Sequence, residues 1–154
     1  MMVNLSISNN SKKSYNFFLK EDAGVLCAAR GGWLLDLDET RGPAKNNFIK
    51  SLLANHVGTG DWGEPGYQWG FQWWIGATCY GRHSEHNWGN WTWDHDNEQV
   101  QWFDWMNGEP NDFDSQDCMT YLKNQDPFGN GVWHWNDWAC SNTAGYICEK
   151  PANE

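Results

Sequence analysis

Two short motifs near the end of the chain carry side chains that coordinate hard cations. Glu109-Pro110-Asn111 places a carboxylate and an amide two residues apart, and Asn136-Asp137 places a second amide beside a second carboxylate. Calcium in proteins takes about six to eight oxygen ligands, from carboxylates, amide carbonyls and the backbone. Asn, Asp and Pro are also ordinary turn residues, so either motif alone is weak evidence. The two motifs together predict a calcium site.

Short strands must hold these motifs in place. Four apolar or aromatic runs are typical of strands, at residues 73–76, 118–122, 132–135 and 145–148, and a fifth covers residues 15–19. Between them, residues 77–108 are rich in Gly, Asn, Asp and Trp and lack periodicity. This pattern predicts one very long irregular loop, and such loops in compact domains are usually functional.

Two helices are predicted ahead of the buried strands. Residues 23–27 place apolar side chains at helical spacing, and Gly31-Gly32 ends that helix. A second helix opens at Pro43, a favourable first position. Its predicted apolar stripe consists of Ala44, Phe48, Ile49, Leu52 and Leu53. Helices followed by short strands predict an α+β domain.

Length and charge limit the class of protein. The 154 residues fit one domain, and 13 tryptophans exclude a disordered chain. Lys and Arg total 10 against 20 Asp and Glu, a formal net charge of -10. So acidic a chain has no electrostatic footprint for nucleic acid or for an anionic membrane. No apolar run reaches the roughly 18 residues of a membrane span, so membrane insertion is not expected.

Five cysteines predict an oxidising compartment. They are Cys27, Cys79, Cys118, Cys140 and Cys148, with no Cys-x-x-Cys pair. Two disulfides and one remaining thiol are typical of a secreted domain. Glycosylation sequons at Asn4, Asn9 and Asn90 agree with a secreted, extracellular protein. The alternative is a cytosolic protein with five reduced thiols.

The order of these motifs along the chain is more specific than any one of them. The residues that carry it are Ala23 to Cys27 with Gly31-Gly32 and Leu35, Trp74-Ile75-Gly76-Ala77, Trp102-Phe103-Asp104-Trp105, Gly108-Glu109-Pro110-Asn111, Asp117-Cys118, Trp135-Asn136-Asp137 with Cys140, and Tyr146-Ile147-Cys148-Glu149. This order resembles the C-type lectin-like domain family over residues 14–150, which leaves residues 1–13 and 151–154 as tails. The resemblance implies two helices flanking short antiparallel sheets, with a long irregular loop that binds calcium and sugar.

The resemblance also implies how the cysteines pair. It implies the disulfides Cys27–Cys148 and Cys118–Cys140. Cys79 is then unpaired. It is either a buried thiol or an intermolecular disulfide that makes a homodimer or larger oligomer.

The same resemblance implies one calcium ion and a ligand set. The ligands are Glu109, Asn111, Gln116, Asn136 and Asp137, with a cis peptide bond before Pro110. Sugar-binding members usually have Glu where this chain has Gln116, so fewer ligand charges should weaken calcium binding. Where acids would hold an auxiliary ion, this chain has Cys79 and His83. We therefore expect one calcium ion and no second one, and weaker binding at low pH because Glu109 and Asp137 must be deprotonated.

The implied ligand is the terminal sugar of a glycan. Two vicinal hydroxyls would bind the calcium. One would donate a hydrogen bond to Glu109 and accept one from Asn111, and the other would do the same with an acid and Asn136. The Glu-Pro-Asn order resembles that of members selecting mannose, glucose, N-acetylglucosamine or fucose. Phe113 and Trp138 flank the motifs, and each either stacks on a sugar or packs the loop. An exposed aromatic ring at Phe113 would also suit galactose.

Other features favour ordinary structural roles. The central tryptophans Trp62, Trp69, Trp88, Trp91 and Trp93 fit a core between loops better than a second sugar platform. His83, His86 and His95 lack the spacing of a closed zinc site and are predicted to be surface residues. No nucleophile–base arrangement stands out, so no enzyme is predicted. The rival function is a protein-binding or structural member of the same fold, which Gln116 favours. Partners would be glycans on cell surfaces or glycoproteins, bound with avidity by an oligomer.

Overall fold

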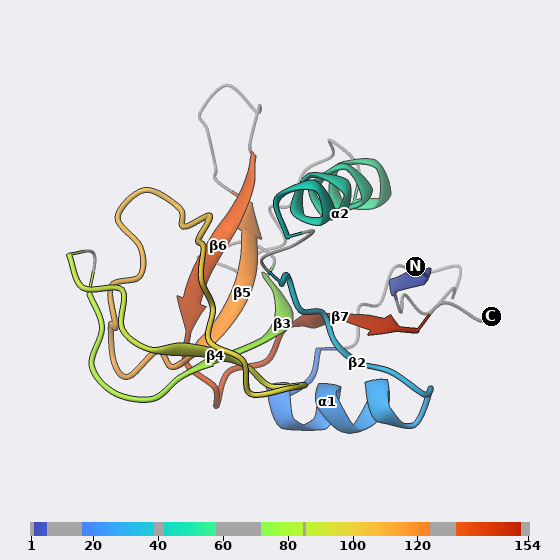
Figure 1. Cartoon of the computed structure of the whole chain (residues 1–154), viewed down its shortest axis with the longest axis horizontal. Helices are drawn as coiled ribbons and strands as arrows, with labels where there is room; N and C mark the ends of the chain where they lie inside the picture. The colour runs from blue at the N-terminus through green and yellow to red at the C-terminus, as the bar shows by residue number, and fades with distance from the viewer. Residues whose placement is uncertain are drawn as a thin grey trace.

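The described part of the chain forms two helices and seven strands, arranged as in Figure 1. The computed structural model describes residues 2–5, 17–38, 42–57, 72–84, 86–123 and 132–151. The helices are α1 (Lys20–Ala28) and α2 (Gly42–Val57). The strands are β1 (Met2–Leu5), β2 (Trp33–Leu34), β3 (Gln72–Cys79), β4 (Trp91–Trp93), β5 (Cys118–Lys123), β6 (Trp133–Trp138) and β7 (Gly145–Lys150). The α+β class predicted from the sequence is confirmed.

The strands pair into one mixed sheet. Its order is β1-β7-β3-β5-β6, with β2 also pairing β7 and β4 also pairing β3. The pairings among the described strands are antiparallel except for β3 with β7, which run parallel at Trp73–Gly145 and Trp74–Tyr146. The expectation of antiparallel sheets therefore needs this correction. A parallel pair needs a long connection, and the chain between β3 and β7 supplies one.

The first strand lies inside the segment predicted as a tail. Met2–Leu5 pairs antiparallel with β7, from Lys150 back to Ile147. This pairing covers an edge of β7 that would otherwise offer unpaired backbone groups. In the predicted strand at residues 15–19, Phe18 makes a single bridge to Ala144, and residues 15 and 16 lie outside the described part.

Two apolar clusters occupy the two faces of the sheet. Because side chains alternate along a strand, Trp73 and Ile75 join the larger cluster, whereas Trp74 joins the smaller one beside α1. Trp91 and Trp93 lie in the larger cluster, as predicted. Trp88 instead is 46% exposed, and Trp62 and Trp69 lie outside the described residues.

Helix α2 turns a different face inward from the one predicted. Ile49 and Leu53 are buried as expected, but Ala44 and Phe48 are exposed. Lys45 and Asn46 are buried in their place. Both are satisfied by partners: the Lys45 amine donates to Glu149 and Asp36, and the Asn46 amide oxygen accepts from Tyr121 and Trp135. A polar residue with such partners can be buried without a large penalty.

The cysteines pair as the resemblance implied. Cys27–Cys148 joins α1 to β7, and Cys118–Cys140 joins the start of β5 to the segment after β6. Cys79 is free and buried. Among the described helices, neither is long and apolar enough to cross a membrane.

Candidate functional site

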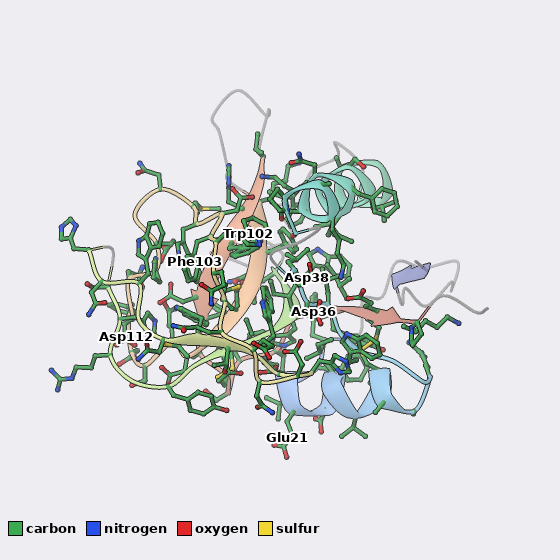
Figure 2. All side chains as sticks on the ribbon, viewed as in Figure 1. Glu21, Asp36, Asp38, Trp102, Phe103 and Asp112 are labelled. Carbon is green, nitrogen blue, oxygen red and sulfur yellow. A yellow bond between two sulfur atoms is a disulfide. The ribbon has the colours of Figure 1, made fainter. Side chains whose placement is uncertain are left out.

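A segment without regular structure brings the Glu-Pro-Asn motif to β6. Residues 104–106 run alongside this strand: the Trp135 amide donates to the Asp104 carbonyl at 2.8 Å, and the Met106 amide donates to the Trp135 carbonyl at 2.8 Å. Trp102 and Phe103 anchor the segment from inside (Figure 2), each within 6.4 Å of the Trp135 ring by centroid distance. The aromatic residues before the motif therefore position it.

The carboxylate of Asp137 is the anchor on which the motif closes. Its Oδ1 accepts the backbone N–H of Asn111 at 3.1 Å, and its Oδ2 accepts that of Asp112 at 2.7 Å. Asp137 is 0% exposed. The Glu109–Pro110 peptide bond is cis, as the resemblance implied. Asn111 Nδ2 donates to Glu109 Oε1 at 3.0 Å, so the amide and the carboxylate lie side by side.

A histidine that the sequence placed on the surface lies inside this site. The His83 side chain is 0% exposed, and its Nε2 lies 2.9 Å from Asp137 Oδ2 and 3.8 Å from Asp112 Oδ1. The prediction of a surface residue is wrong for His83, whereas His86 and His95 are exposed. The one signal in the sequence was that His83 stands where the resemblance expects an acid.

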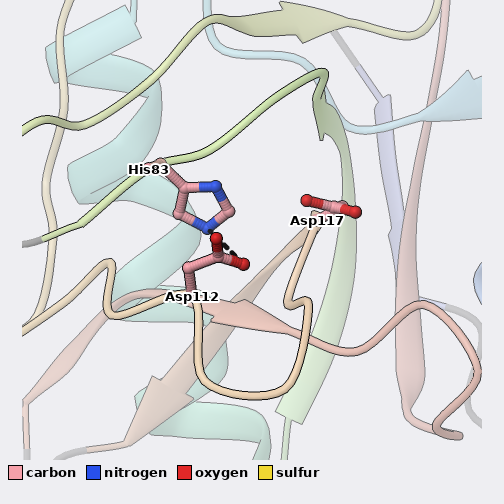
Figure 3. A group of neighbouring side chains, drawn as sticks. All are labelled: His83, Asp112 and Asp117. Atoms are coloured by element: carbon pink, nitrogen blue, oxygen red, sulfur yellow. Dashed lines mark ion pairs between the residues drawn. The ribbon is translucent and has the colours of Figure 1, made fainter.

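Acids outnumber cations in what we call the histidine cluster: His83, Asp112, Asp117 and Asp137. A ligand atom from each of His83, Asp112 and Asp117 lies within 4.8 Å of the others (Figure 3). In Figure 3 the His83 ring and the Asp112 carboxylate face each other, with Asp117 across from them. Three carboxylates around one imidazole leave an excess of negative charge, which attracts a cation.

The electrostatics of the cluster favour the charged forms of both central groups. Burial alone lowers the pKa of His83, but the hydrogen bond and charge of Asp137, with the Gly81 carbonyl and Asp112, raise it above its ordinary 6.5. Burial alone raises the pKa of Asp137, but hydrogen bonds from His83 and the surrounding loop lower it below 3.8. An ion pair between buried groups explains both directions.

Four of the five predicted ligands belong to this loop and its anchor. Glu109, Asn111 and Asp137 are linked by the hydrogen bonds above. Gln116 is 8% exposed, and its Oε1 is buried without a hydrogen-bond partner among the described residues. An orphaned buried amide oxygen beside acids is a donor that a calcium ion would satisfy, so these residues fit the ion.

Asn136 does not join them. Its Nδ2 donates to Gln72 Oε1 at 3.0 Å, on the face of the sheet opposite Asp137. Trp138 lies on the same face as Asn136, where it packs against the smaller apolar cluster. The structure therefore separates Asn136 and Trp138 from the Glu109–Asn111 pair, and it favours packing over sugar stacking for Trp138.

Phe113 and Cys79 have opposite environments. Phe113 is 71% exposed, two residues beyond Asn111, which leaves its ring free to meet a ligand. Cys79 is 2% exposed, and burial raises the pKa of its thiol to about 11. A buried, protonated thiol cannot reach another chain, so an intermolecular disulfide at Cys79 is not supported.

Comparison with known proteins gives a consistent family. The sequence profile of the family described as "Lectin C-type domain" matches residues 19–150. A "Perlucin-like protein" of Mytilus galloprovincialis is 24% identical over 128 residues, which cover 82% of this chain and 67% of the relative.

Two solved structures share the fold. The C-type lectin domain of murine dendritic cell inhibitory receptor 2, solved in complex with N-glycan, is 21% identical with a TM-score of 0.60, over 86% of this chain and 81% of that one. Herring type II antifreeze protein is 22% identical with a TM-score of 0.56, over 89% of this chain and 86% of that one. At such identities the likeness shows the fold alone.

Proposed function

The chain belongs to the C-type lectin domain family, a family of non-catalytic carbohydrate-binding domains, and we propose that it binds terminal sugars of glycans through one calcium ion. The ion would be held by Glu109, Asn111, Gln116 and Asp137. The observation that carries the proposal is the anchoring of the Glu-Pro-Asn loop by the buried Asp137 carboxylate, with the orphaned Gln116 oxygen in the same loop.

The ligand set explains what the chain's own residues contribute. A bound calcium ion supplies open coordination positions for two vicinal hydroxyls. The Glu109 carboxylate would accept a hydrogen bond from one hydroxyl, and Asn111 Nδ2 would donate to a hydroxyl oxygen. These two groups already hydrogen-bond each other at 3.0 Å, so a hydroxyl inserted between them meets a donor and an acceptor together. Ligand binding would thus exchange one hydrogen bond for two.

The sugar class follows from the order of acid and amide. Glu-Pro-Asn resembles the order of mannose-type members, so we propose equatorial vicinal hydroxyls, as in mannose, glucose, N-acetylglucosamine or fucose. The exposed Phe113 ring could also stack on the apolar face of galactose. We further propose that the protein is extracellular, which two disulfides support. We propose too that it acts as a dimer or larger oligomer, since single sugar sites bind weakly.

Calorimetry tests the site. Titration of the protein with calcium chloride should give one ion per chain, and methyl α-mannoside should bind only afterwards. The double variant Glu109→Gln/Asn111→Asp should keep calcium binding and shift the preference towards galactoside. Mannoside binding that is unchanged by this variant or by EDTA would overturn the proposal.

The contact of Asn136 with Gln72 favours a second candidate function. The Asn136 amide donates to Gln72, and among the described residues the loop pairs an acid with an amide at Glu109 and Asn111. This favours a member of the fold that recognises a protein or another surface. A partner that is not displaced by millimolar monosaccharide would support that alternative.

A further inference from the structure

We propose that His83 is a positioning residue that holds the calcium-binding loop in its folded shape before any ion binds. Its Nε2–H would do so by fixing the Asp137 carboxylate, which in turn holds the amides of Asn111 and Asp112. The expected effect on calcium affinity rests on the proposed function. The expected effect on the folded shape of the loop rests on geometry alone.

The hydrogen-bond chain is continuous and buried. An ionised carboxylate only accepts hydrogen bonds, so at 2.9 Å from Asp137 Oδ2 the His83 Nε2 carries the proton. The same Oδ2 accepts the Asp112 amide at 2.7 Å, and Oδ1 accepts the Asn111 amide at 3.1 Å. Removal of the imidazole therefore takes a side-chain donor, at 2.9 Å, away from the carboxylate that anchors the loop.

The backbone around His83 is built to admit the ring. Gly89 adopts φ +74, and a Cβ there would lie 2.7 Å from His83 Cβ and 2.9 Å from Cys79 Sγ. The ring then meets Trp91 edge-on at 5.1 Å, and its Nδ1 lies 3.4 Å from the Gly81 carbonyl. Contacts on each side fix the ring orientation, so Nε2 faces Asp137 at 2.9 Å, with Asp112 Oδ1 farther away at 3.8 Å.

The position of His83 explains how the loop can close with a single ion. The resemblance expects acids of an auxiliary cation site near residues 79 and 83, and this chain has Cys79 and His83 instead. The imidazole brings a hydrogen-bond donor to Asp137 at 2.9 Å and lies 3.8 Å from Asp112. It thereby does within the protein what an added cation would do for these acids.

Three variants separate this role from packing. His83→Ala removes the donor, and His83→Gln restores an amide N–H of similar reach without an imidazole. His86→Ala, at an exposed histidine three residues on, is the matched control. Amide hydrogen exchange at Asn111 and Asp112 is measured in EDTA, and calcium affinity is measured by calorimetry. Thermal unfolding of each variant shows whether the domain stays folded.

The proposal predicts lost amide protection in His83→Ala and retained protection in His83→Gln and His86→Ala. Calcium affinity should fall by about 10–100-fold in His83→Ala and recover in His83→Gln, the range seen when a residue supporting a metal ligand is removed. Unchanged protection in His83→Ala, tighter calcium binding in it, or equal loss in both His83 variants would overturn the proposal. If the wild type binds no calcium, the proposed calcium dependence fails, and the exchange data still decide the role of His83.

Discussion

Two charge clusters in this domain differ in how fully their acids are paired. The lysine cluster joins Lys45 of α2 to Asp36 and to Glu149 of β7, with Lys45 Nζ 2.7 Å from each Glu149 oxygen and 3.4 Å from Asp36 Oδ1. The histidine cluster gathers three carboxylates around His83. In the first, one ammonium lies within bonding distance of both acids. In the second, three carboxylates lie around one imidazole, and the orphaned Gln116 oxygen lies in the same loop.

The difference shows which cluster is structural. In the lysine cluster each charged group has a partner within the protein, and three elements are tied together. The histidine cluster has more carboxylates than basic groups. It lies at a loop that reaches the surface beside the exposed Phe113. The surplus acids, Asp112 and Asp117, are half-buried, and like charges held this close attract a cation, so the surplus favours a binding site.

The largest expected effect comes from breaking the lysine cluster. Lys45→Met keeps the length of the side chain but leaves Asp36 and Glu149 without their ammonium, so the free energy of unfolding should fall by about 3–5 kcal/mol. Urea unfolding with the disulfides intact measures it. Lys50→Met is the matched control, because the Lys50–Asp104 pair is more exposed and should cost about 1 kcal/mol or less. Equal losses of unfolding free energy in Lys45→Met and Lys50→Met would contradict this prediction.

The histidine cluster should respond in binding more than in stability. Asp137→Asn removes a ligand charge and turns an amide N–H towards donors, so calcium affinity should fall by about 100-fold. Calorimetry measures it. Asp114→Asn, at an exposed acid of the same loop, should leave the affinity within about twofold. An Asp137→Asn protein that binds calcium normally would show that the ion lies elsewhere.

Asp104, an acid outside both clusters, tests whether an acid with several partners makes the stability depend on pH. Burial alone raises the pKa of Asp104, but Lys50, Asn46 and His134 lower it below its ordinary 3.8. Because the folded value is the lower one, the acid contributes stability above pH 3.8, and this is lost as the pH falls through the folded value. The wild type should therefore exceed Asp104→Asn in unfolding free energy at pH 6, with the gap closing towards pH 2. A constant gap would exclude a role for its charge.

The smallest effect is expected at Cys79. Cys79→Ser should change the unfolding free energy by about 1 kcal/mol and leave the oligomeric state unchanged, because the thiol is buried. Analytical ultracentrifugation without reductant measures the state. Loss of an oligomer in this variant would show that the thiol does reach a neighbouring chain.

The sequence predicted the fold where local signals and motif order agreed. The strand at Trp73–Gly76 follows from its apolar run, and the end of α1 follows from Gly31-Gly32. Both disulfides follow from the family resemblance. Contacts distant in sequence were missed: the burial of Lys45 depends on Glu149, 104 residues away, and β1 on its pairing with β7.

Part of the candidate site could not be predicted, and the reason is geometric. Asn136 and Asp137 are neighbours in a strand, so their side chains leave opposite faces of the sheet, and only Asp137 meets the loop. The motif alone suggests a common role for both. His83 lies 54 residues before Asp137, and no local pattern links them.

A glycan array in millimolar calcium, repeated in EDTA, tests the central claim most directly. The account predicts signal on glycans that end in mannose, glucose, N-acetylglucosamine or fucose, lost in EDTA and lost in Asp137→Asn. Calcium-dependent signal on galactose-ended glycans would keep the site and show that Phe113 outweighs the Glu-Pro-Asn order. Absence of signal in both conditions, or signal that survives EDTA, would contradict calcium-dependent sugar binding at this loop.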